Sequence, residues 1–202
     1  MKPQWQRIAA MTLRIFIEDE RRVDTELKQL IVLISDTKAL VEAKLRGSDQ
    51  LEWLEAIKFE PFAPNPHSGN NGTTNLFEFV NQTWTTIATY LGLKYLYSID
   101  KFKTKRYKIN LGVRSGPDIL SDDLKIEAEV FATTDYTNNG KLRGDIQRLA
   151  AKPEIPHRFI FAFVPDKKLK NPEHYKSRNL ETEGIVVKAF DMTDLRSEFS
   201  LS

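Results

Sequence analysis

The sequence contains no cysteine, so the chain forms no disulfide, binds no metal through thiolates and has no cysteine nucleophile. It has no run approaching the roughly 20 apolar residues of a membrane-spanning helix, and no signal peptide is recognisable. The three histidines, His67, His157 and His174, lack the spacing of metal ligands, and neither a phosphate loop nor a nucleophile elbow occurs. These absences favour a cytoplasmic protein that spans no membrane.

The composition that remains is typical of a globular protein. Hydrophobic residues make up 41% and charged residues 29% of the 202 residues, enough for one domain with a sizeable core. The net charge of +2 conceals two basic stretches, 101–108 and 167–179. Basic patches attract phosphate, although such side chains also occur on any solvated face. The candidate DNA contacts in the first stretch are Lys103, Lys105, Arg106 and Lys108.

The first third of the chain is expected to be helical. Residues 4–46 lack Gly and Pro and carry an amphipathic stripe, which predicts one long helix. A shorter helix is expected over 50–59, followed by a loop rich in Pro, Gly and Asn over 60–75. We therefore expect an N-terminal helical segment, 1–65, and a second part, 66–202. The helical segment has more apolar surface than one core needs, which makes it the expected dimer interface.

The second part predicts a mixed α/β fold. Asn75 is a suitable N-cap for a long helix, Glu78 completes a capping box and Gly92 is expected to end that helix. Alternating apolar and polar residues predict a strand over 105–114. The remaining elements are expected to be a strand at 124–132, a helix at 141–152, and apolar strands at 158–165 and 184–190. The strand–helix–strand passage implies parallel strands, so the sheet is mixed and flanked by helices.

The strand at 124–132 carries Glu127 and Glu129 inside an apolar run. Carboxylates are rarely buried unless they are paired or bind a metal. Side chains alternate along a strand, so Lys125 and both glutamates share one face, and Asp118 arrives from the turn before. Two interpretations stay open. The face is polar and solvated, with the lysine paired to a glutamate, or the three acids bind Mg²⁺ or Mn²⁺.

Asp118 after Pro117, with the Glu-Ala-Glu tripeptide at 127–129, lies in a helix, three strands, helix, strand order. This combination resembles the PD-(D/E)xK nuclease superfamily, which includes many type II restriction endonucleases. The resemblance covers about residues 75–190. It implies a restriction-endonuclease-like core and Mg²⁺-dependent hydrolysis of phosphodiester bonds in double-stranded DNA.

The resemblance also implies roles for particular residues. Asp118 and Glu127 match the positions that hold Mg²⁺, for which Mn²⁺ is the expected substitute. The third position of the motif is usually Lys and is Glu129 here, which would orient or deprotonate the attacking water or bind a second ion. Lys125 or Lys141 would stabilise the charge that builds on the phosphate.

Two helices supply further candidates. Some members of the superfamily add an acid from the helix before the sheet, which matches Glu78, although its capping box explains this residue equally well. The helix at 141–152 has a charged stripe that meets either the DNA backbone or only solvent. The members of the stripe are Lys141, Asp145, Arg148 and Lys152. Arg143 and Arg148 are the candidate DNA contacts on this helix.

Together these expectations describe a Mg²⁺-dependent endonuclease, most simply a type II restriction enzyme that cuts a specific site as a homodimer. Two alternatives stay open. The missing motif lysine also fits a non-catalytic nucleic-acid-binding module on a degenerate nuclease fold. The other alternative is a repair or transposon-associated nuclease without sequence preference.

Overall fold

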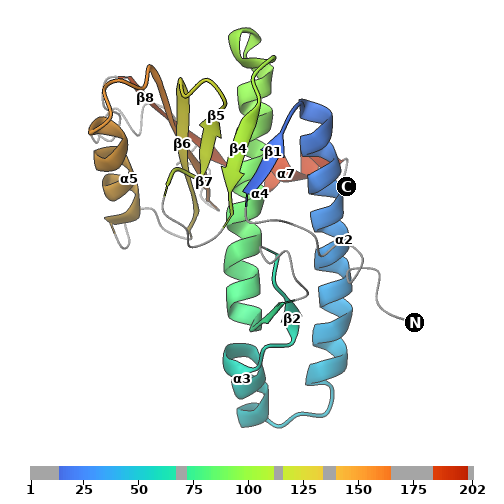
Figure 1. The fold of residues 1–202 in the computed structure, drawn as a ribbon. Helices are drawn as coiled ribbons and strands as arrows, with labels where there is room; N and C mark the ends of the chain where they lie inside the picture. Colours follow the sequence, from blue (N-terminus) through green and yellow to red (C-terminus); the bar gives the residue numbers. More distant parts are fainter. Residues whose placement is uncertain (1–13, 67–71, 112–115, 134–139, 165–183, 200–202) are drawn as a thin grey trace.

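The computed structural model describes residues 14–66, 72–111, 116–133, 140–164 and 184–199, and its centre is a six-stranded mixed sheet (Figure 1). In sheet order the strands are β1 (Arg14–Ile17), β4 (Tyr107–Asn110), β5 (Ile119–Ser121), β6 (Ile126–Ala132), β7 (His157–Phe163) and β8 (Ile185–Phe190). Neighbouring strands are antiparallel from β1 to β6, and β6, β7 and β8 are parallel. The predicted mixed α/β class is confirmed.

Helices cover the sheet and extend beyond it. They are α2 (Glu20–Leu45), α3 (Gln50–Phe59), α4 (Leu76–Ser98), the short 3₁₀ turn η1 (Asp100–Phe102), α5 (Lys141–Ala150) and α7 (Met192–Phe199). A two-stranded sheet joins β2 (Ala63–Pro64) to β3 (Thr73–Thr74). Figure 1 shows the lower halves of α2 and α4, together with α3, projecting below the six-stranded sheet.

Each face of the central sheet packs against helices. One core joins α2 and α4 to one face of β6, formed by Ile126, Ala128 and Val130. A second core lies between α5 and the opposite face, where Phe131 is buried. The predicted alternation of faces along this strand is therefore correct. Of the two interpretations of the opposite face, the solvated one is wrong, because α5 covers this face and both Glu127 and Glu129 are buried.

The expected helix over residues 4–46 is wrong at residues 14–19, the first part of this range that the structure describes. Residues Arg14–Ile17 form β1, which pairs with β4 at the edge of the sheet. β-Branched and aromatic side chains favour this strand. α2 begins only at Glu20, because Asp19 caps it by accepting a hydrogen bond from the Arg22 backbone N–H at 2.9 Å.

The N-terminal segment 1–65 is also less separate than expected. It includes a strand of the central sheet, and the buried residues of β1 and α2 belong to the same core as those of α4. The loop near residue 65 therefore does not separate two hydrophobic cores. The reason is that the stripe of α2 packs on α4 instead of closing a core of its own.

Gly92 does not end α4, which continues to Ser98. The glycine lies where α4 meets β7, and a Cβ there would come within 2.4 Å of the Phe161 ring. The absence of a side chain at Gly92 allows the helix to approach the sheet closely. β5 and α7 were not predicted from the sequence.

Candidate functional site

Asp118 and Glu129 face each other across the β5–β6 hairpin. Ile119 is the cross-strand neighbour of Ala128, so the residue before β5 lies opposite Glu129. The Val130 backbone N–H donates a hydrogen bond to Asp118 Oδ2 at 2.7 Å and holds this carboxyl beside β6. Opposite residues of an antiparallel pair share a face. Both acids therefore lie on the side of the sheet that α5 covers.

The surroundings of Asp118 disfavour its charged form. Burial, together with the nearby negative charges of Glu129 and Asp145, raises the pKa of Asp118 to about 7. The Val130 hydrogen bond and the positive charge of Lys141 act in the opposite direction. These effects require the three acids and the lysine to lie close together.

The charged stripe of α5 faces β6 and not only solvent. Arg148 donates to both carboxylate oxygens of Glu129, at 3.4 and 3.1 Å, and also pairs with Asp145. One turn later, Lys152 pairs with Glu127. Residues two apart on a strand share a face, so Glu127 and Glu129 both point toward α5 and the turn that follows it. The buried acids of β6 thus have basic partners from α5 and from the turn that follows it.

Asp145 is the most deeply buried acid of this cluster. Its side chain is 0% exposed, and its Oδ1 lies 3.1 Å from Lys141 Nζ and also pairs with Arg148. Its Oδ2 is buried and finds no hydrogen-bond partner among the described residues. Burial raises the pKa of Asp145, as it does for Asp118. From the sequence, the charged stripe that contains Asp145 could face either the DNA backbone or only solvent. The burial of Asp145 depends on how α5 is rotated over the sheet, which tertiary contacts determine.

The residue types around Asp118 suit a hard divalent cation. Asp118, Glu129 and Asp145 supply carboxylate oxygens, which Mg²⁺ and Mn²⁺ prefer. Among the described residues these three acids face two basic side chains, Lys141 and Arg148, and one buried oxygen has no hydrogen-bond partner there. Within the described ranges, no three acidic or imidazole groups already form a metal-binding group. An ion would be held by Asp118 and Glu129, with Asp145 beside them.

Glu127 is further from Asp118 than the sequence pattern suggested. Its cross-strand neighbour is Leu120, whereas Asp118 lies opposite the next acid of the strand. The Glu127 side chain is buried and held by Lys152. The structure thus brings Asp118 together with Glu129 more directly than with Glu127.

Two other predicted catalytic residues lie away from this point. Lys125 is exposed immediately before β6, four residues from Glu129, which is about 13 Å along an extended chain. Glu78 is exposed at the start of α4, on the opposite side of the sheet, and accepts a hydrogen bond from Gln82 at 2.7 Å. The backbone N–H of Glu78 donates to the Asn75 side chain, so Asn75 is the helix cap as predicted, but the predicted capping box is incomplete because the Glu78 side chain accepts from Gln82 instead. Neither residue is brought to Asp118.

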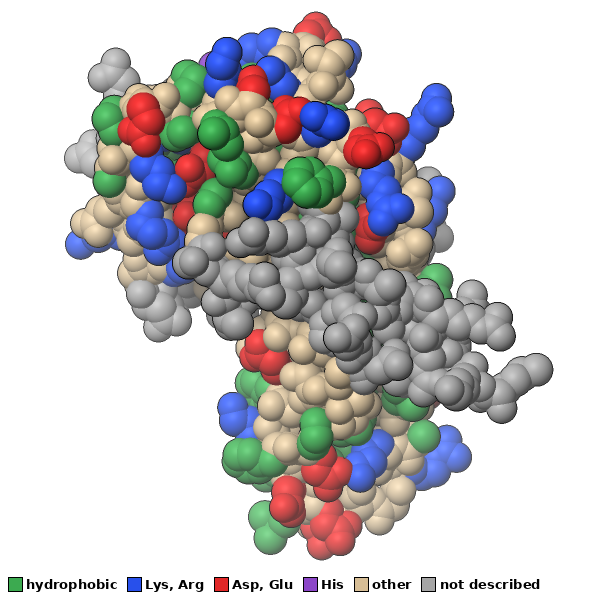
Figure 2. Space-filling view, in the orientation of Figure 1, with side chains coloured by type: hydrophobic (Ala, Val, Ile, Leu, Met, Phe, Trp, Pro, Cys, Tyr) green, Lys and Arg blue, Asp and Glu red, His purple; other side chains and the backbone are tan. Residues whose placement is uncertain are grey.

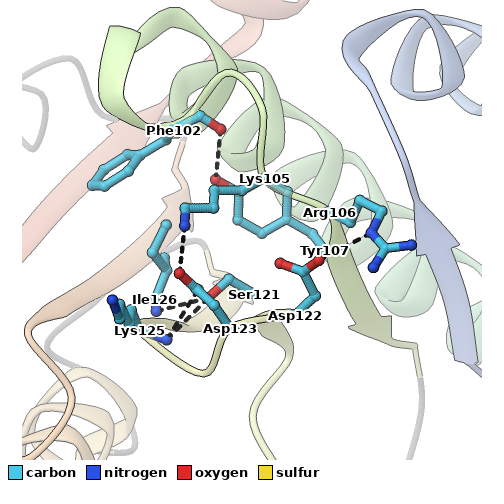
Figure 3. A network of polar contacts seen from close by, with 9 residues as sticks. All are labelled: Phe102, Lys105, Arg106, Tyr107, Ser121, Asp122, Asp123, Lys125 and Ile126. Carbon is cyan, nitrogen blue, oxygen red and sulfur yellow. Dashed lines mark hydrogen bonds and ion pairs between the residues drawn. The ribbon is translucent and has the colours of Figure 1, made fainter.

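The basic stretch before β4 is engaged in a network of ion pairs (Figure 3). Lys105 points toward Asp123 and pairs with it, and Arg106 Nε donates to Asp122 at 2.9 Å. The hydrogen bond from Lys105 lowers the pKa of Asp123 to about 2. Ser121 donates to the same aspartate and accepts from the backbone of β6, which orders the turn. The positive charge of both basic residues is therefore partly balanced within the protein.

The other predicted DNA contacts differ in their surroundings. Lys103 is exposed and lies 2.6 Å from Asp100. Lys108 is half-buried on β4. Arg143 is exposed on α5 and forms no ion pair with a described residue. The second basic stretch, 167–179, lies outside the described residues.

Comparisons with protein-family models, curated proteins and solved structures found no match to this chain. Among the helices in the described part of the chain, none has both the length and the apolar character needed to cross a membrane. Function is therefore inferred from the geometry of the site.

Proposed function

We propose that this protein is a Mg²⁺-dependent endonuclease that hydrolyses phosphodiester bonds of double-stranded DNA in the cytoplasm, most simply as a type II restriction enzyme. The observation that carries the proposal is the placement of Asp118 opposite Glu129, at the point where α5 contributes Lys141 and Asp145. The chain order α4, β4, β5, β6, α5, β7 supports it, because it follows the helix–three strands–helix–strand order of the nucleases that the sequence resembles.

In this proposal Asp118 and Glu129 hold the ion, and Glu129 takes the place that the sequence pattern gave to Glu127. A divalent ion bound there supplies activated water and neutralises charge on the phosphate. Lys141 stabilises the negative charge that develops on the scissile phosphate. Asp118 must lose its proton to serve as a ligand, so its raised pKa makes ion binding strengthen as the pH rises through about 7.

A non-catalytic nucleic-acid-binding module is the second candidate. It is favoured by the basic partners of the buried acids. Arg148 forms an ion pair with Glu129, and Lys152 forms one with Glu127. In that case the cluster only stabilises the packing of α5 on the sheet.

The test is incubation of the purified protein with long duplex DNA in Mg²⁺, in Mn²⁺ and in a chelator. We expect cleavage with either ion and none with the chelator, and discrete fragments if the enzyme is site-specific. Asp118→Ala should abolish cleavage while circular dichroism and DNA binding in Ca²⁺ are retained. Absence of cleavage by the wild type with both ions would favour the non-catalytic module. A continuous smear would indicate a nuclease without sequence preference.

A further inference from the structure

α3 and the start of α4 expose several large apolar side chains to solvent. Leu51, Leu54 and Phe59 are 77%, 55% and 73% exposed, and the adjoining Phe77 of α4 is 54% exposed. All four line one shallow hollow of about 510 Å³. Ala56 is the only fully buried residue of α3. Hydrophobic side chains are visible at the lower end of the molecule in Figure 2, where these elements lie.

This apolar surface is not explained by the fold or by the candidate site. Single exposed hydrophobic residues are ordinary, but a contiguous group of them marks a contact surface. α3 projects below the sheet (Figure 1), whereas the acidic cluster lies between β6 and α5. The surface is therefore available to a partner without obstructing the cluster.

We infer that this surface binds a second copy of the same chain, with the two α3 helices antiparallel. The charges of α3 are divided along its length: Glu52 lies in its first turn, Glu55 near its middle, and Lys58 in its last turn. Antiparallel pairing can set Glu55 of each helix beside Lys58 of the other, whereas parallel pairing in register sets like charges side by side. Glu55 forms no ion pair with a described residue, so it is available for this contact.

The pairing has a definite register. With a two-fold axis beside Ala56 and Ile57, Glu55 lies at the level of Lys58 of the second copy, and symmetry repeats the contact. The same register sets Leu54 at the level of Phe59 of the second copy, so the apolar side chains cover one another. Lys58 is also held near the apolar surface, because its Nζ lies 4.9 Å from the centre of the Phe77 ring.

The dimer does not depend on nuclease activity, but it would serve the proposed function by supplying a second catalytic centre for the second DNA strand. A ten-residue helix is only about 15 Å long. Stable interfaces bury about 800 Å² on each partner, so an interface centred on α3 should dissociate on dilution.

The test is sedimentation velocity without DNA or metal, from about 1 μM to about 100 μM protein. We expect the mass to rise from one chain to two. Glu55→Lys and Lys58→Glu should each weaken the dimer at least about tenfold, because each places like charges at the same level. The double variant Glu55→Lys with Lys58→Glu restores opposite charges and should return the dissociation constant to within about threefold of the wild type. Lys103→Glu, beyond the C-terminal end of α4 and directly after η1, is the matched control and should leave the dissociation constant of the dimer unchanged.

Circular dichroism verifies that each variant is folded. A mass of one chain at every concentration, single variants that associate like the wild type, or a double variant weaker than both singles would each overturn the inference. Because no DNA or metal is present, these outcomes are independent of whether the protein cuts DNA.

Discussion

Asp118 is a carboxyl group whose pKa in the folded chain lies close to neutral pH. Its pKa is about 7 in the folded protein, against about 3.9 in an unfolded chain. Between these values the folded protein binds a proton that the unfolded chain releases. The contribution of this residue to the free energy of unfolding therefore falls as the pH rises from about 4 to about 7, and stays constant above.

Asp118→Asn should stabilise the protein when no metal is present. Asparagine still accepts the Val130 hydrogen bond but carries no charge to bury. The gain in melting temperature over the wild type should be larger at about pH 8 than at about pH 5 and correspond to a few kcal/mol. Added Mg²⁺ should raise the melting temperature of the wild type and not that of the variant. A gap between the two proteins that does not change with pH would contradict the raised pKa.

The identity of the site residues was only partly predictable from the sequence. Alternation along a strand correctly places Glu127 and Glu129 on one face. Choosing between them requires the register of the β5–β6 hairpin, and β5 has only three residues, too few to recognise by pattern. The burial of Asp145 depends on the rotation of α5 over the sheet, which local sequence does not specify.

The helices and strands were predicted where their periodicity is long or their composition uniform. β6, β7, β8 and α5 lie within a few residues of the expected bounds. β1 and the end of α4 were not predicted, for a shared reason. Gly92 and the strand at Arg14–Ile17 acquire their conformations from contacts with distant residues, β7 in one case and β4 in the other.

Gly92→Ala tests the packing of α4 on the sheet. The new methyl group would meet the buried Phe161 ring, whose three nearest atoms lie between 2.4 and 2.9 Å from it. Overpacking of this kind costs about 1–3 kcal/mol, and the better helix propensity of alanine offsets only part of that cost. We expect urea denaturation to show a net loss of about 1–2 kcal/mol.

Gly144→Ala is the matched control for this substitution. Gly144 is also inside a helix, but a Cβ there would meet no atom within 4 Å. The control should stabilise the protein by about 0.5–1 kcal/mol. If Gly92→Ala behaves like the control, α4 is not packed against Phe161 as described.

For the whole molecule, the charge distribution predicts which basic residues contribute to DNA affinity. Arg143 has no acidic partner among the described residues, whereas Lys105 is paired with Asp123. Arg143→Gln should lower the slope of log affinity against log salt by about one, and Lys105→Gln by clearly less. Fluorescence anisotropy in Ca²⁺, which avoids cleavage, measures both slopes. Equal reductions would mean that the ion pair at Lys105 does not screen it from DNA.

The central claim is that Asp118 and Glu129, and not Glu127, form the metal-dependent centre of a nuclease. The most direct measurement is the rate of Mg²⁺-dependent cleavage of duplex DNA by Glu129→Gln and by Glu127→Gln, two substitutions of the same type on the same face of β6. We predict a loss of at least about 10²-fold for Glu129→Gln and a much smaller loss for Glu127→Gln, whose position is held by Lys152. Near-wild-type cleavage by Glu129→Gln, or the larger loss in Glu127→Gln, would contradict this account.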